Sequence, residues 1–248
     1  MLLVQGTAAR HLHWGERLLS LLATSFDVVA YDHRGVGDSK PADAPFGIED
    51  LADDAAALLD ELGWPRAHVV GVSMGGLVAQ ELALRHPDRV ETLLLGCTHP
   101  GGAGSPSAVP DALVSATVRG DAAATLRNVF RAGVKDPERV RPQAWEEYGA
   151  AALTRPVPAR TTTLQISAVA GHSTAERLHR ITMPTHVLHG DTDRLVPVEA
   201  GRALASAIPG ACLTVLSAGH FFWLEQPERT AELVEESISR ASGADAHR

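Results

Sequence analysis

A serine flanked by closely spaced glycines is the first feature of the sequence that points to chemistry. Residues 71–76 read GVSMGG and lie between a short apolar run, which predicts a buried strand, and an apolar helical pattern. In that context G-x-S-x-G is typical of a nucleophile elbow, a strand-to-helix turn that lifts the serine hydroxyl above a sheet. Flanking glycines let neighbouring backbone pass close to the strained turn, and the helix behind it offers positive potential to an oxyanion. We therefore predict that Ser73 is a nucleophile.

Other glycine-rich turns have to be weighed against this interpretation. A phosphate-binding P-loop needs a lysine after its second glycine, and a dinucleotide-binding turn needs G-x-G-x-x-G. The segment around Ser73 has neither pattern. A plain structural turn remains open on this segment alone, so the partners of a serine nucleophile have to be found elsewhere in the chain.

Two later turns offer the base that a serine nucleophile needs and the acid that orients the base. Residues 189–193 read HGDTD and residues 218–220 read AGH, and each turn is next to an expected strand. Elbow enzymes carry serine, acid and histidine in this chain order, and open α/β sheets bind ligands at the carboxyl ends of their strands. We predict that His220 is the base and Asp193 the acid. Asp191 lies beside Gly190 and is better placed to shape the turn.

The elements that must position these residues alternate along the chain, as in a parallel sheet covered by helices on both faces. Between residues 100 and 182 the strand pattern is lost, and helical stretches occur around 121–132, 142–153 and 162–178. We expect an α/β core from residues 1–99 and 183–242, and a helical cap over Ser73 from residues 100–182. The expected strands are 2–5, 27–31, 67–72, 90–97, 185–188 and 212–216; the expected core helices are 48–62, 75–86, 198–207 and 227–240.

Composition excludes several other classes of protein. The net charge of -8, with no block of Lys or Arg, disfavours a nucleic-acid partner. Two cysteines do not make a disulfide scaffold, and His11 and His13 lack the further ligands of a metal site. No run reaches the roughly 18 apolar residues of a spanning helix, and the start MLLVQG is too short for a signal peptide. We expect a cytoplasmic protein without cofactor, metal or membrane partner; nothing in the sequence indicates an oligomeric state.

Taken together, several segments resemble the α/β-hydrolase family, most closely its small cap-bearing esterase, lactonase and haloperoxidase-like branch. The likeness runs from residue 2 to near residue 228, broken only by the expected cap. It implies a triad of Ser73, Asp193 and His220, an oxyanion hole from the backbone amides of Thr7 and Met74, and acyl transfer as the reaction. The segments that carry the resemblance are LLVQG, YDHRGVGDS, GVSMGG, PTHVLHGDTDRLVP and AGHFFWLEQPE.

The sequence departs from the family pattern in two places. Gln5 precedes Gly6 where the family has His-Gly, and we expect an adjusted oxyanion loop rather than an inactive enzyme. The chain also begins almost on the oxyanion strand, whereas relatives carry an antiparallel strand pair ahead of it. The strand at 27–31 is then expected at the edge of the sheet. We hypothesise either a start site assigned too late or an unusual variant of the fold.

The best-supported function is hydrolysis of a small carboxylic ester or lactone through an acyl-enzyme. Carbon–carbon bond hydrolysis in a diketone and perhydrolysis are alternatives with the same triad, and a non-catalytic ligand receptor is an alternative of another class. Epoxide hydrolases and haloalkane dehalogenases are disfavoured, because they place Asp at the elbow. The expected pocket residues are Trp14, His99, Trp145, His172 and Phe221, and Tyr148, Leu164 and Phe222 are also considered. For each of them, packing of the cap against the core is the alternative to contact with the substrate.

Overall fold

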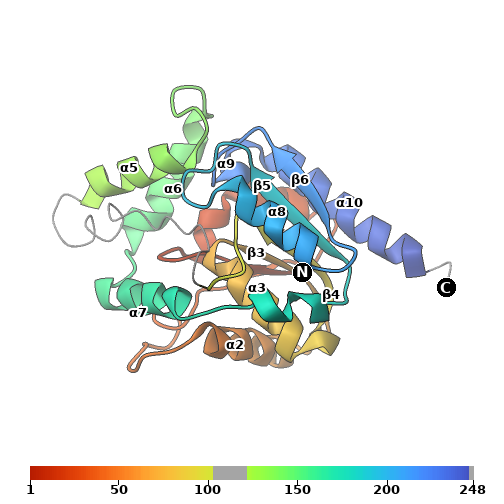
Figure 1. The fold of residues 1–248 in the computed structure, drawn as a ribbon. Helices are drawn as coiled ribbons and strands as arrows, with labels where there is room; N and C mark the ends of the chain where they lie inside the picture. Colours follow the sequence, from red (N-terminus) through yellow and green to blue (C-terminus); the bar gives the residue numbers. More distant parts are fainter. Residues whose placement is uncertain (103–121, 246–248) are drawn as a thin grey trace.

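The computed structural model describes residues 1–102 and 122–245, and a parallel sheet lies at its centre (Figure 1). In this part of the chain the sheet has six strands in the order β2-β1-β3-β4-β5-β6, and every pair is parallel. The expected α/β-hydrolase sheet is confirmed, and the segment expected at 27–31 forms its edge as a two-residue strand. The strands are β1 (Leu2–Val4), β2 (Val29–Ala30), β3 (Ala67–Val72), β4 (Val90–Gly96), β5 (Thr185–Gly190) and β6 (Cys212–Leu216).

The central strands are apolar because both faces of the sheet are buried. Successive side chains of a strand point to opposite faces. Leu2 and Val69 therefore join one hydrophobic core, whereas Leu3 and Val70 join the other. This two-sided burial accounts for the continuous apolar runs that predicted the strands.

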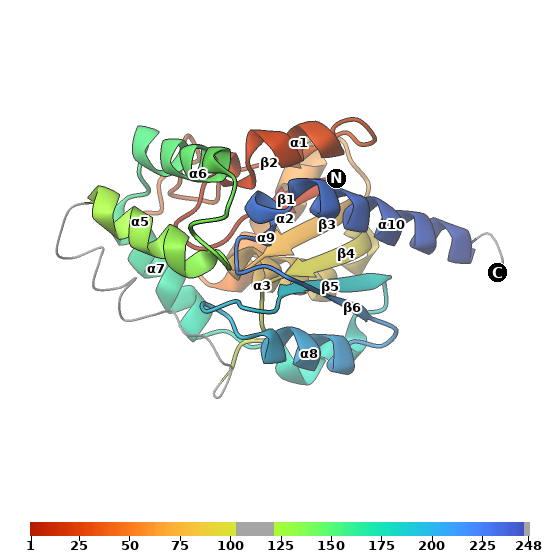
Figure 2. The same cartoon turned by 90° about the horizontal axis from the view of Figure 1, so that it is seen from above.

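Helices cover each face, as Figure 2 shows most clearly. One core holds apolar side chains of α2 (Ile48–Glu61), α3 (Met74–Arg85) and α8 (Val198–Ala207). The other holds those of α1 (Glu16–Leu22), α9 (Phe222–Glu225) and α10 (Pro227–Asp245). The described chain also contains short 3-10 helices, namely η1 (His11–Trp14), η2 (Pro87–Arg89) and η3 (Ala175–Arg180).

Three helices connect β4 to β5 in the described part of the chain, namely α5 (Ala122–Gly133), α6 (Pro142–Thr154) and α7 (Ala159–Ala170). They lie beside one end of the sheet in both views (Figures 1 and 2). The helix expected at 162–178 differs, because α7 ends before Gly171 and the chain turns back to the core through η3. The limits of a cap at 100 and 182 stay a prediction, and residues 103–121 lie outside the described residues. No described helix combines the length and the apolar character needed to cross a membrane.

Candidate active site

Ser73 occupies a strained turn between β3 and α3. Its backbone has φ 55 and ψ -124, a conformation that side-chain-bearing residues rarely adopt. The turn is possible because of glycine: a Cβ on Gly75 would lie 2.1 Å from the carbonyl oxygen of Val4, and one on Gly71 would lie 2.3 Å from that of Gly75. Thr98 Oγ1 donates a hydrogen bond of 2.7 Å to the Ser73 carbonyl. The sequence therefore builds an elbow that strand and helix hold from both sides.

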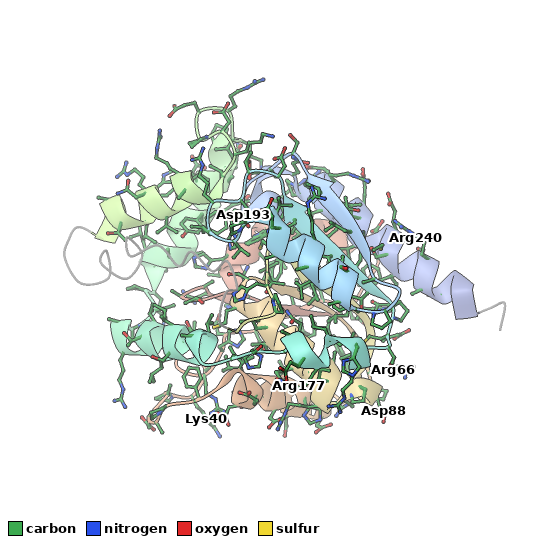
Figure 3. The ribbon with its side chains drawn as sticks, viewed as in Figure 1. Lys40, Arg66, Asp88, Arg177, Asp193 and Arg240 are labelled. Carbon is green, nitrogen blue, oxygen red and sulfur yellow. The ribbon has the colours of Figure 1, made fainter. Side chains whose placement is uncertain are left out.

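His220 and Asp193 come from the loops after β6 and β5 and meet in a buried hydrogen bond. His220 Nδ1 donates to Asp193 Oδ2 over 2.8 Å. Asp193 Oδ1 accepts the backbone N–H groups of Leu195 and Val196 at 2.8 and 2.9 Å. With Nδ1 carrying the proton, Nε2 of His220 keeps the lone pair that a general base needs. Figure 3 labels Asp193 at the end of the sheet where α5 and α6 lie.

Asp193 is an ionised carboxylate in a buried place. Burial raises its pKa, but the nearby charge of His220, the close approach of His189 Nε2 at 3.5 Å, and hydrogen bonds from His220 and the Val196 amide outweigh it, and the pKa lies well below its usual range. Asp191 is different: it is exposed, and both of its oxygens pair with Lys135 Nζ at 2.8 and 3.0 Å. Of the two acids in the turn, Asp193 is therefore the one joined to His220.

The loop after β1 passes directly above Ser73. A Cβ on Gly6 would lie 3.0 Å from Ser73 Cβ, so the loop and the elbow are in close approach. Gln5 is buried, and its Oε1 accepts the N–H of Gly6 at 3.0 Å. Thr7 and Met74, whose amides the resemblance implies as oxyanion donors, line the same cavity as Ser73. Met74 is the first residue of α3, where a backbone N–H has no partner within the helix.

That cavity has a volume of about 430 Å³ and lies between the loops at the end of the sheet and the helices that connect β4 to β5. Its wall includes segments after five strands together with side chains of α5, α6 and α7. Of the expected pocket residues, His99, Tyr148 and Phe221 line it. Other lining residues include Arg10, His13, Leu126, Val129, Leu195 and Trp223.

The structure places the remaining expected pocket residues elsewhere. Trp14 is buried against Trp223 in the core under α1, with ring centroids 5.6 Å apart. Trp145 packs behind the wall against Phe130 at 5.3 Å. His172 turns toward α2 and α3 and lies near acids there. Leu164 and Phe222 pack against the two cores. In each case the packing of neighbouring helices and strands directs the side chain away from the cavity.

Several lining or supporting residues escaped the sequence analysis. Arg10 and His13 follow the oxyanion strand closely, so their position in that loop was an available signal. Burial lowers the pKa of His13 to about 4 and that of His99 to about 4, so both rings are neutral at physiological pH. Gln165 of α7 accepts the N–H of Ala8 at 2.8 Å, and no local pattern marked it.

Two groups of side chains have metal-ligand chemistry within the described residues. Cys97, Asp193 and His220 lie close together, but the acid and the histidine already bind each other. Glu49, Glu81 and His172 form the second group, and Arg177, labelled in Figure 3, donates to both oxygens of Glu81. The guanidinium supplies the positive charge that a cation would bring, so we assign no metal to either group.

Similarity to known proteins identifies the family to which the chain belongs. The family model described as alpha/beta hydrolase fold matches residues 1–227. The chain belongs to the α/β-hydrolase fold family. A 2-hydroxymuconate semialdehyde hydrolase of Pseudomonas putida is 34% identical over 225 residues, which cover 86% of this chain and 77% of the relative.

Two further relatives, one similar in sequence and one in structure, are also hydrolases. A poly(3-hydroxyalkanoate) depolymerase of Ectopseudomonas oleovorans is 30% identical over 87% of this chain and 76% of its own. The crystal structure of the enol-lactonase from Burkholderia xenovorans LB400 superposes with a TM-score of 0.83 and 27% identity, covering 96% of this chain and 90% of that one. These relatives are hydrolases, and this chain is a hydrolase of the same family.

Proposed function

We propose that the protein is a serine hydrolase that cleaves a small carboxylic ester or lactone through an acyl-enzyme. The observation that carries the proposal is the 2.8 Å hydrogen bond between His220 Nδ1 and Asp193. The same His220 lines the cavity that also contains the strained Ser73. A base oriented by a buried acid, beside a serine on an elbow, is the arrangement that activates a hydroxyl for acyl transfer.

The proposed reaction uses each of these groups in turn. His220 Nε2 takes the proton of Ser73 as its oxygen attacks the carbonyl carbon. The amides of Thr7 and Met74 stabilise the oxyanion, and His220 then protonates the departing alkoxide. In a lactone the alcohol stays attached to the acyl chain. Water, deprotonated by His220, releases the acid and restores Ser73.

The cavity suits a small substrate. A volume of about 430 Å³ is within the ordinary range for small-molecule sites. Apolar side chains of the inserted helices, such as Leu126, Val129 and Leu153, supply much of the wall. They offer contact area to an acyl or alcohol chain without competing for the carbonyl.

The test combines turnover with covalent labelling. Wild type should hydrolyse p-nitrophenyl acetate and butyrate and react with a fluorophosphonate probe, whereas Ser73→Ala should do neither. Ser167→Ala, on the exposed side of α7, is the matched control and should behave as wild type. Labelling or turnover that persists in Ser73→Ala would show that another group is the nucleophile. A folded wild type that does neither would overturn the proposal.

Carbon–carbon bond hydrolysis is a second candidate, favoured by the similarity to two 2-hydroxymuconate semialdehyde hydrolases at 34% and 30% identity. The same triad would serve, with a carbon leaving group in place of an alkoxide. Comparing kcat/KM for 2-hydroxymuconate semialdehyde with that for p-nitrophenyl butyrate separates the two. A preference for the ester supports the first candidate, and a preference for the semialdehyde supports the second.

A further inference from the structure

Arg10 is a buried cation in the wall of the cavity that holds Ser73. It lies in the loop after β1, three residues beyond Thr7, and its side chain is 8% exposed. Its Nε is buried and has no hydrogen-bond partner among the described residues. A guanidinium carries five N–H donors, and a buried donor left unpaired is costly. The fold therefore maintains hydrogen-bonding capacity here that the protein itself does not use.

The nearest carboxylate does not take up these donors. Asp32 Oδ2 is 3.7 Å from Arg10 Nε, close enough for attraction but beyond a hydrogen bond. The other oxygen, Oδ1, accepts both the backbone N–H of His11 at 2.6 Å and its Nδ1 at 3.0 Å. Asp32 thus balances the charge of Arg10 and helps to hold it in place, but it accepts no hydrogen bond from the guanidinium.

The rest of the wall favours an anion. The described lining residues include no Asp or Glu, whereas they include a second cation, Arg155, which pairs with Asp38 where both are exposed. His13 Nδ1 accepts the backbone N–H of Arg10 at 3.0 Å, so this ring faces Arg10 as a neutral acceptor. Arg10 is therefore the buried positive group of the described wall.

We propose that Arg10 is a specificity-determining residue that binds a carboxylate on the substrate, so that the preferred substrates are half-esters or lactones bearing a free carboxylate. The planar fork of arginine matches a carboxylate, and charge-assisted pairs of this kind are strong in a site shielded from water. The inference rests on the proposed function, since it places the carboxylate in the cavity where Ser73 attacks the ester.

The first experiment measures selectivity. The mono-p-nitrophenyl esters of succinate, glutarate and adipate are compared with neutral p-nitrophenyl esters of matched chain length. For at least one length, wild type should favour the anionic ester by about tenfold or more in kcat/KM. Arg10→Gln should lower this preference by about 10- to 100-fold, chiefly through KM, and Arg10→Lys should keep part of it. Arg131→Gln, an exposed arginine of α5 paired with Glu138, is the control and should keep the full preference.

The second experiment measures binding without catalysis. Isothermal titration of Ser73→Ala should show tighter binding of monomethyl glutarate than of dimethyl glutarate, and the difference should vanish in Ser73→Ala/Arg10→Gln. If the glutamine variant does not fold, as judged by circular dichroism, Arg10→Lys replaces it in both experiments. Because lysine keeps the charge but not the planar fork, the anionic preference and the binding difference should then be reduced rather than abolished.

The two experiments separate the failure of this inference from the failure of the proposed function. Ser73-dependent turnover with equal rates on anionic and neutral esters, and equal binding of the two glutarates, overturns the role of Arg10 alone. A preference that survives in Arg10→Gln overturns it as well. Absence of both labelling and turnover overturns the proposed function, and an Arg10-dependent preference for monomethyl glutarate in Ser73→Ala would still support the carboxylate site.

Discussion

Asp193 uses both of its oxygens at once: one faces His220, and the other accepts two backbone amides. Asparagine keeps the shape but presents an amide group that cannot stabilise a protonated imidazole and favours the wrong tautomer. Asp193→Asn should therefore lower kcat for p-nitrophenyl butyrate by about 10³- to 10⁴-fold, with a much smaller change in KM.

The neighbouring acid provides the control for this substitution. Asp191→Asn removes the exposed pair with Lys135, a contact of small energetic weight, and should leave kcat within a few-fold of wild type. Equal losses in the two variants would mean that the turn, and not the carboxylate beside His220, is what matters.

Single residues were predictable where local turn chemistry defines them. Ser73, Asp193 and His220 each lie beside a strand end in a turn with its own glycine pattern, so their neighbourhood could be expected from the sequence. Trp14 and His172 could not be placed in this way. The direction of each side chain depends on how the surrounding helices pack, and that information is spread over distant segments. The burial of Arg10 beside Asp32 is of the same kind.

At the scale of elements, α7 supports the loop after β1 through one hydrogen bond. Gln165, fully buried, accepts the N–H of Ala8, whose φ of 55 is a strained conformation next to Thr7. Gln165→Met fills similar space without an acceptor. We expect kcat to fall by about 10- to 100-fold while KM changes less, because the amide of Thr7, the proposed oxyanion donor, would be displaced.

Thr163→Ala is the control on the same helix, since Thr163 is exposed and its hydroxyl donates to the Ala159 carbonyl of α7. It should keep the kcat of wild type. Loss of kcat in both variants would indicate that α7 acts through its general stability, and an unchanged Gln165→Met would remove the proposed support of the loop.

The close approach of α3 to β1 gives a second prediction at this scale. Gly75→Ala places a methyl group 2.1 Å from the Val4 carbonyl oxygen, so helix and strand must separate. The free energy of unfolding in urea should fall by about 3 kcal/mol or more, since backbone cannot yield as a flexible side chain can. At Gly171 an added Cβ would lie 3.5 Å from the Ser167 carbonyl oxygen, an ordinary van der Waals contact, so alanine should be tolerated there within about 1 kcal/mol. Equal stability of the two variants would contradict this account.

Elements were predictable to the extent that periodicity defines them. The helix expected at 48–62 is α2, because its apolar positions recur on one buried face. The helix expected at 162–178 was too long, since apolar spacing continues past Gly171 although the chain there turns to reach the core. The strand expected at 27–31 is shorter for a different reason: it pairs along β1, which is itself three residues long.

At the scale of the whole molecule, buried histidines make stability depend on pH. His13 and His99 have pKa values of about 4, against 6.5 for an exposed ring, with burial as the main cause. Below pH 6.5 the unfolded chain binds protons that the folded protein does not, so stability is complete above that pH and is lost as the pH falls toward 4. Between pH 7 and pH 5 the free energy of unfolding should fall by up to about 2 kcal/mol for each ring.

Urea unfolding at several pH values measures this slope. His13→Gln should show a smaller loss of stability on acidification than wild type, whatever its stability at neutral pH. His179→Gln, at an exposed position, should keep the wild-type slope. A wild-type stability that stays constant or rises between pH 7 and pH 5 would contradict the assignment of neutral buried rings.

The position of Trp223 has a practical consequence. Its indole lines the cavity, lies 6.4 Å from the His220 ring, and is fixed by a hydrogen bond of 2.8 Å to the His13 carbonyl. The fluorescence of an indole responds to the polarity and to the quenching groups around it. A compound that displaces solvent beside Trp223 should therefore change the emission of the unmodified protein. Candidate substrates, including those that carry no chromophore of their own, can then be screened by titrating them into the protein and recording its tryptophan fluorescence.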